Sequence, residues 1–125
     1  MITEDYCSYE VAKLLKEKGF EILTSRVYDN QKELDYQYVV CWQEERLPYV
    51  SAPTLQMAMK WLREVHNIFI VIEPHMYDYI NEKTSSYVTS LWQGDNYHEN
   101  ITSKDYPTYE EAVEATLKYC LENLI

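Results

Sequence analysis

The sequence has 125 residues with a formal net charge of −10, from 21 acidic and 11 basic residues, and a hydrophobic content of 46%. This length and composition are typical of a single globular domain with one core, spanning residues 1–125. The negative charge disfavours direct binding to nucleic acid or to an anionic membrane, since both need an excess of Lys and Arg. No apolar run of membrane-spanning length and no signal-peptide pattern occurs, so we expect a soluble, cytoplasmic protein.

Cysteine and glycine usage excludes several kinds of site. Cys7, Cys41 and Cys120 are odd in number, and their spacing fits neither a disulfide framework nor a zinc site, so we expect reduced thiols. The only glycines, Gly19 and Gly94, leave no glycine-rich loop that could cradle a phosphate. The sequence therefore predicts no metal site and no cofactor.

The N-terminal part predicts a helix followed by a β-hairpin. Apolar residues recur at helical spacing over residues 8–19, with Ser8 able to cap the start and Gly19 the end. Strands are expected at residues 20–28 and 36–43, around a polar turn. The second strand has large apolar groups on both faces, which favours a central place in the sheet.

A proline-bounded loop at residues 46–53 precedes the strongest helical pattern, at residues 54–66, which Asn67 can terminate. The apolar side chains of this helix cover an arc of about 200°, which is about twice the minimum arc that a helix needs to face one core. Met57, Met59 and Trp61 spread over both sides of this arc. The helix is thus expected to contact two surfaces, the second of which belongs either to another helix or to another subunit, and of these we predict a homodimer.

A second hairpin is predicted from an apolar run at residues 68–73 that ends at Pro74, a continuation at residues 77–80, and a strand at residues 86–93. In the last strand, three residues face one way and three the other: Tyr87, Thr89 and Leu91 against Val88, Ser90 and Trp92.

Residues 94–107 are polar and are expected to be irregular, and Thr108 with Glu111 then forms a capping box for a helix that runs to the C-terminus. The fold class is α+β, with about four antiparallel strands in two hairpins and three helices. The predicted order is α-β-β-α-β-β-α, with the helices mainly on one face of the sheet.

No histidine has a partner at ligand spacing. His66 falls in the last turn of a helix, where a cation complements the helix dipole, while His75 and His98 are expected in loops. One alternative function is a small hydrolase or transferase that uses the His75 and His98 loops.

Thirteen tyrosines and three tryptophans are the main enrichment of the sequence. They can be cross-strand pairs of a half-buried sheet, or they can form a partner surface on the sheet face that no helix covers. Under the second interpretation, the partner surface also includes residues of the predicted helix at 54–66. The partner-binding residues are then Trp42, Trp92, Tyr36, Tyr38, Tyr87, Met57, Met59 and Trp61.

Residues 8–20, 52–66 and 108–112 resemble a group of short uncharacterised proteins of gut anaerobes and their phages. The likeness covers about a third of the chain, at the three predicted helices, and implies a phage or mobile-element setting without lending an activity or a catalytic residue. The leading hypothesis is a non-enzymatic module that binds another protein. A further alternative is an acidic mimic of nucleic acid that inhibits a DNA- or RNA-binding enzyme.

Overall fold

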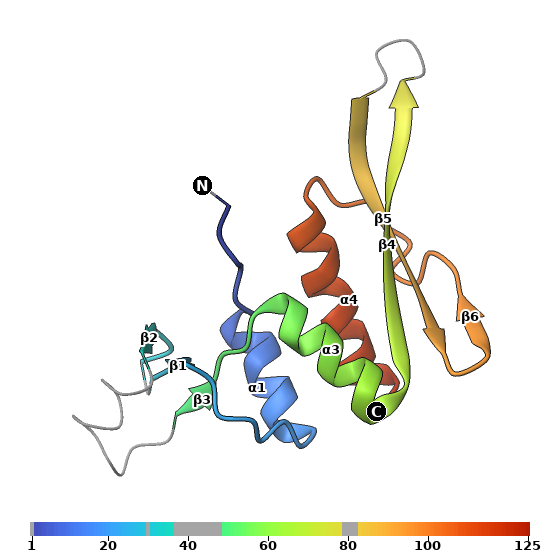
Figure 1. Cartoon of the computed structure of the whole chain (residues 1–125). Helices are drawn as coiled ribbons and strands as arrows, with labels where there is room; N and C mark the ends of the chain where they lie inside the picture. The colour runs from blue at the N-terminus through green and yellow to red at the C-terminus, as the bar shows by residue number, and fades with distance from the viewer. Residues whose placement is uncertain (1, 30, 37–48, 79–82) are drawn as a thin grey trace. The chain divides into compact units, whose positions relative to one another are not determined.

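The structure is a computed structural model that describes residues 2–29, 31–36, 49–78 and 83–125. These residues form an α+β protein with three helices and two three-stranded antiparallel sheets (Figure 1). The chain divides into two compact units, Met1–Ala58 and Met59–Ile125. The α+β class is confirmed, and the single domain stays a prediction.

The first helix, α1, spans Tyr9–Glu17. Ser8 Oγ accepts a hydrogen bond from the Val11 backbone N–H at 3.2 Å and so satisfies one of the donors that a helix start leaves unpaired. Beyond the helix end, Gly19 has a φ of +100°, which side-chain-bearing residues rarely adopt. The predicted helix and both of its end signals are confirmed.

The N-terminal sheet has the order β2-β1-β3, with β1 at Arg26–Tyr28, β2 at Leu34–Tyr36 and β3 at Val50–Ser51. The predicted hairpin is confirmed in its pairing, since Val27 lies opposite Asp35. Its turn is held by Asp29, whose Oδ1 accepts from the backbone N–H groups of residues 31 and 33.

Two details of this sheet differ from the predictions. The central strand of the described sheet is β1, and β2 lies at its edge; β2 shares only Tyr36 with the strand that was expected to be central. The reason is β3, which pairs with the other side of β1 although it belongs to the expected loop at residues 46–53. A two-residue strand is too short to show alternation in a sequence. Most of the second predicted strand, residues 37–43, lies outside the described residues.

The helix α3 spans Leu55–His66, and Asn67 follows it with a left-handed φ of 56°, both as predicted. Met59 and Trp61 are each only 7% exposed, and the Trp61 indole contacts the His66 ring at 4.7 Å between centroids. Met57 is 41% exposed. The wide apolar arc is therefore largely covered within the chain, which removes much of the argument for a homodimer; the homodimer itself stays a prediction.

The C-terminal sheet has the order β4-β5-β6, with β4 at Ile68–Asp78, β5 at Lys83–Gln93 and β6 at Asn96–His98. The second predicted hairpin is confirmed. Strand β4 continues through Pro74 instead of ending there, and its register shifts next to His75 and Met76. Strand β6 lies in a segment predicted to be irregular, and Gly94, with a φ of +61°, allows the tight turn before it.

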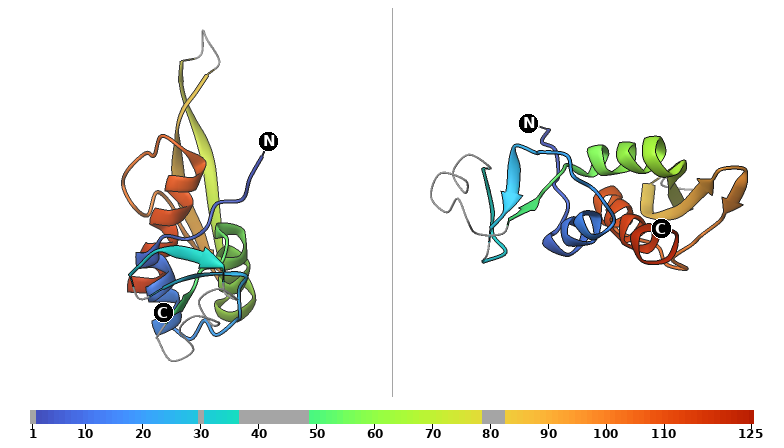
Figure 2. Two further views of the ribbon diagram at one scale, coloured as in Figure 1. Left: turned by 90° about the vertical axis from the view of Figure 1, so that its left-hand side faces the viewer. Right: turned by 90° about the horizontal axis from the view of Figure 1, so that it is seen from below.

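The last helix, α4, spans Tyr109–Asn123 and begins at Thr108, whose Oγ1 accepts from the Glu111 backbone N–H at 3.1 Å. It contacts β4 and β5 and runs beside them in each view (Figure 2). Its predicted apolar stripe is buried at Val113, Leu117, Cys120 and Leu121. In this sheet, Ile68, Thr89 and Leu91 have fully buried side chains.

The element order is therefore α1-β1-β2-β3-α3-β4-β5-β6-α4, with six described strands in two sheets. The predicted four strands and the order α-β-β-α-β-β-α miss β3 and β6, which have two and three residues. The prediction of helices on one face presumed a single sheet. Instead α1 contacts β3 of one sheet and α4 contacts β4 and β5 of the other.

We predict that Leu117→Ala lowers the free energy of unfolding by about 2 to 5 kcal/mol, because it removes buried methyl groups and leaves a cavity under α4. Leu117 is 0% exposed, whereas Leu23 is 67% exposed. Leu23→Ala is the matched control and should change stability by less than about 0.5 kcal/mol. Urea unfolding followed by circular dichroism measures both, and equal losses would contradict the assigned core.

Cys120 should resist alkylation in the folded protein. Burial raises the pKa of its thiol from 9.0 to about 12, although hydrogen bonding to the backbone lowers it in part. The thiolate that reacts is thus scarce at neutral pH, and the sulfur is inaccessible. Iodoacetamide labelling with peptide mass spectrometry should modify Cys120 only after denaturant is added. Rapid labelling of the native protein would show that α4 is not packed as described.

Candidate functional site

The C-terminal sheet carries a row of exposed aromatic side chains. Phe69 on β4 lies opposite Trp92 on β5, and Trp92 lies opposite Tyr97 on β6. Residues directly opposite in antiparallel strands project from the same face, so the three rings form one line across the sheet. They are 43%, 43% and 46% exposed, and the Trp92 and Tyr97 ring centroids are 4.8 Å apart. We call these three residues the aromatic row.

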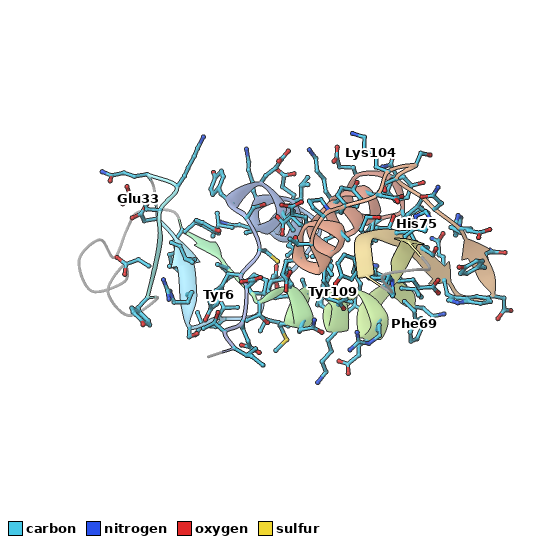
Figure 3. All side chains as sticks on the ribbon, turned by 90° about the horizontal axis from the view of Figure 1, so that it is seen from above. Tyr6, Glu33, Phe69, His75, Lys104 and Tyr109 are labelled. Atoms are coloured by element: carbon cyan, nitrogen blue, oxygen red, sulfur yellow. The ribbon has the colours of Figure 1, made fainter. Side chains whose placement is uncertain are left out.

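The neighbours of the aromatic row in sequence show why it is exposed. Side chains alternate between the faces of a strand, and the residues just before Phe69 and Trp92 are Ile68, 1% exposed, and Leu91, 0% exposed. These two belong to the core of the unit. Phe69, correspondingly, points outward from β4 (Figure 3). Alternation therefore places the three rings on the face opposite Ile68 and Leu91, where each ring is 43–46% exposed.

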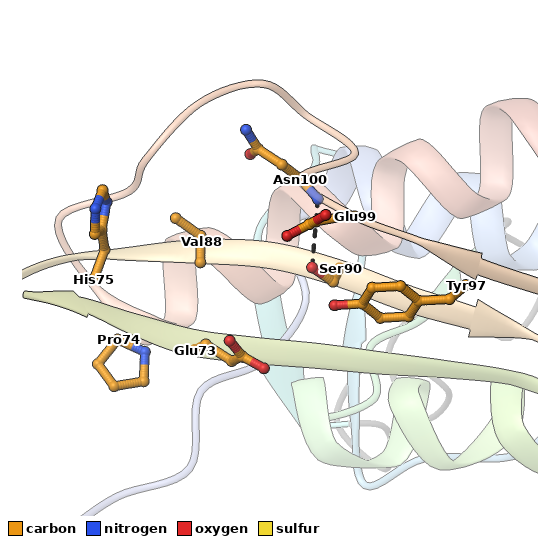
Figure 4. Close-up of a pocket in the computed structure, with 8 residues that line it drawn as sticks. All are labelled: Glu73, Pro74, His75, Val88, Ser90, Tyr97, Glu99 and Asn100. Carbon is orange, nitrogen blue, oxygen red and sulfur yellow. Dashed lines mark hydrogen bonds between the residues drawn. The ribbon is translucent and has the colours of Figure 1, made fainter.

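A cleft of about 300 Å³ adjoins the aromatic row and shares Tyr97 with it. Tyr97 points into the cleft (Figure 4). The segment after β6 forms one wall, where the Asn100 backbone N–H donates to Ser90 Oγ at 3.3 Å. The cleft is lined by Glu73, Pro74, His75, Val88, Ser90, Tyr97, Glu99 and Asn100.

At the other end of the cleft, one carboxylate oxygen holds two side chains from the hairpin. Asp105 Oδ2 lies 2.7 Å from His75 Nδ1 and accepts a hydrogen bond from Ser86 Oγ at 2.9 Å. The side chains of His75 and Asp105 are 45% and 28% exposed, and Ser86 is buried. The strand pairing brings this about, because His75 lies opposite Ser86 and Tyr106 forms a bridge with Tyr87.

The order of these three groups determines their chemistry. In a serine-nucleophile triad the imidazole stands between the hydroxyl and the carboxylate and accepts the hydroxyl proton. Here the carboxylate of Asp105 stands between Ser86 and His75, so the hydroxyl donates to the carboxylate. The arrangement suits a carboxylate that orients an imidazole for proton transfer, and it does not activate Ser86 as a nucleophile.

His75 and His98, which were expected in loops, both lie in strands. His98 is in β6 opposite Leu91, whose side chain is buried. Its neighbours Tyr97 and Glu99 line the cleft and His98 does not. Alternation therefore directs His98 away from the cleft and from His75. The two histidines of the predicted hydrolase or transferase site do not share that site.

The predicted partner residues lie in several environments. Trp92 is exposed in the aromatic row, whereas Tyr87 contacts the ring of Tyr109 at 6.1 Å between centroids. Tyr36 belongs to the other sheet, where the Arg26 guanidinium lies 4.5 Å from its ring centroid. Tyr38 and Trp42 lie outside the described residues. Among the helical candidates, Met59 and Trp61 are buried and Met57 is exposed.

Sequence reasoning missed Phe69, Tyr97 and Asp105. Phe69 lies in an unbroken apolar run that gives no sign of which residue faces outward, and Tyr97 and Asp105 lie in a segment predicted to be irregular. A turn signal at Gly94-Asp95, followed by Tyr97, could have indicated the third strand.

Comparisons with protein-family models, with curated proteins and with solved structures found no match. Over the part of the chain that the structure describes, no three His, Cys, Asp or Glu side chains gather as metal ligands would. Within the same residues, no helix has the length and apolar character needed to cross a membrane. The site is thus defined by its own geometry: an aromatic row, a cleft with two glutamates, and an Asp105-centred cluster.

A double-mutant cycle tests that cluster. Asp105→Ala and Ser86→Ala each remove the same hydrogen bond. The double variant should therefore lose less free energy of unfolding than the two single variants lose in sum, with a coupling energy of about 1 kcal/mol. The control cycle pairs Asp105→Ala with Glu122→Ala, an exposed residue of α4, and should be additive. Additivity in the first cycle, measured by thermal unfolding, would contradict the Ser86–Asp105 contact.

Proposed function

We propose that this protein is a non-enzymatic module that binds another protein through the aromatic row. The observation that carries the proposal is the exposure of three large rings in one line across β4, β5 and β6. Aromatic residues are enriched in protein interfaces, where a few of them supply most of the binding energy. Exposed rings gathered on one face, in contrast to scattered ones, are typical of an interaction site.

The energetics favour a partner over permanent exposure. Burying such a side chain completely from full exposure contributes roughly 1.5 to 3 kcal/mol. The three rings are 43%, 43% and 46% exposed, so a partner that covers the exposed part of all three gains roughly 2 to 4 kcal/mol in total. Each ring is already positioned by the ladder of β4, β5 and β6, and Trp92 also by its contact with Tyr97. Little conformational entropy is therefore lost when the partner binds.

The phage or mobile-element setting stays a prediction that rests on the resemblance of the three helices. Binding does not depend on it, because the aromatic row would serve any protein partner of matching shape. Nucleic acid is disfavoured as a direct partner by the net charge of −10.

A second candidate is a small hydrolase or transferase, and the 2.7 Å contact between His75 Nδ1 and Asp105 Oδ2 favours it. A carboxylate-oriented imidazole beside a cleft is an arrangement that general acid–base catalysis uses. The hydroxyl of Ser86 is bonded to the carboxylate, so this candidate would use water or a substrate group as the nucleophile. A panel of ester and phosphoester substrates, with His75→Ala as the control, tests it.

Replacing Trp92 should abolish partner capture. The tagged protein is used to capture proteins from a host-cell lysate, and each captured protein is quantified by mass spectrometry for three baits: wild type, Trp92→Ala and Leu23→Ala. The captured amount of the partner should fall to background with Trp92→Ala. It should stay at the wild-type amount with Leu23→Ala, which removes an exposed apolar side chain of the N-terminal unit. Leu23→Ala should unfold at the wild-type urea concentration, whereas Trp92→Ala, which loses the ring contact with Tyr97, should lower the free energy of unfolding by about 1 kcal/mol and still be folded without urea.

Capture of the same proteins in equal amounts by all three baits would overturn the proposed binding surface. If every difference between the baits followed a difference in their stability, the result would count against the proposal as well.

A further inference from the structure

We propose that the partner inserts an arginine- or lysine-bearing segment into the cleft beside the aromatic row. The inference rests on the proposed function, because it names the chemistry of the partner at that same face. Three observations carry it: the charge of the cleft, the position of Tyr97, and the way this chain already binds its own cations.

The cleft has negative charge that the described residues do not neutralise. Glu73 and Glu99 are exposed and line it, and none of its eight lining residues is Lys or Arg. In the described part of the chain neither glutamate carboxylate has an ion-pair or hydrogen-bond partner. His75, the one lining group that can become cationic, is within 2.7 Å of the Asp105 carboxylate. An incoming cation would thus meet two carboxylates ready to accept its hydrogen bonds.

The aromatic wall favours the same occupant. Tyr97 belongs both to the cleft and to the aromatic row, and its ring is close to that of Trp92. A guanidinium or ammonium over the face of a tyrosine or tryptophan is attracted by the negative face of the ring. The methylene stems of Arg and Lys can cover apolar atoms such as those of Val88 while the charged head reaches a carboxylate.

The N-terminal unit shows this mode of contact inside the chain. The Arg26 guanidinium lies 4.5 Å from the ring centroid of Tyr36 and 5.4 Å from that of Tyr6, and Lys32 Nζ lies 5.3 Å from the ring centroid of Tyr9. Here each cation is supplied by the chain itself. The described cleft residues include Tyr97 and the carboxylates of Glu73 and Glu99 but no Lys or Arg. In the proposed complex, the partner supplies this cation.

Other occupants fit less well. A phosphate or an acidic peptide would be repelled by Glu73 and Glu99 and by a net charge of −10. A wholly apolar segment could cover the aromatic row, but it would leave both carboxylates desolvated without a partner. A basic segment with apolar neighbours matches both parts of the surface.

Fluorescence anisotropy with labelled peptides tests the inference. The probe is a fluorescein-labelled peptide of arginine, leucine and serine, compared with the same peptide carrying citrulline at every arginine. Citrulline keeps the shape of the side chain and removes its charge. We expect the arginine peptide to bind at least about tenfold more tightly, and the difference to shrink as salt is raised.

The protein variants are matched in charge. The double variant Glu73→Gln with Glu99→Gln should bind the arginine peptide about tenfold more weakly than wild type. The control, Glu21→Gln with Glu33→Gln, changes exposed residues of the N-terminal unit and should keep its affinity for the peptide within about twofold of wild type. Equal affinity for the two peptides, or equal loss in the two double variants, would overturn the basic segment.

The two proposals fail in different ways. Suppose that capture of the partner is lost with Trp92→Ala but is unchanged with Glu73→Gln and Glu99→Gln. The aromatic row would then remain the binding surface, and the basic segment would be refuted. A partner unaffected by Trp92→Ala would refute the binding surface itself.

Discussion

Antiparallel pairing between β4 and β5 is the constraint on which the C-terminal unit depends. From Ile68 opposite Gln93 to His75 opposite Ser86, one continuous register assigns each side chain of the hairpin to a face. Ile68 and Leu91 thereby join the core of the unit, while Phe69 and Trp92 project from the other face. Core and candidate surface are two consequences of a single register, so a shift of that register would change both.

Much of this fold could be predicted from local signals. Ser8, Asn67 and Thr108 mark helix ends because capping depends on a few neighbouring residues, and all three stand where they were expected. The division of β5 into Tyr87, Thr89 and Leu91 against Val88, Ser90 and Trp92 was also correct, because alternation is visible in the sequence. Strands β3 and β6 were missed because segments of two or three residues form strands only when a neighbour pairs with them.

The candidate site was less predictable, because its parts are distant in sequence. His75 and Asp105 are thirty residues apart, and they meet only because the segment after β6 returns along β5. The aromatic row needs the register of three strands, so composition could indicate an exposed aromatic surface but not its members. Trp92 was anticipated, whereas Phe69 lay hidden in an apolar run. Tyr36, grouped with Trp92 from composition, belongs to a different sheet.

The junction between α3 and β4 has a consequence for how such a surface can evolve. Asn67 reverses the chain in a left-handed conformation, and its carbonyl accepts from the Gly94 backbone N–H at 3.1 Å, so the helix end and the turn before β6 are tied together. Point substitutions at Phe69 or Tyr97 can change the exposed surface while the core is preserved. A one-residue shift of β4 against β5 would instead exchange the two faces of β4 and bring Phe69 to the core face in place of Ile68. The exposed rings can therefore vary in side chain only while this register is kept.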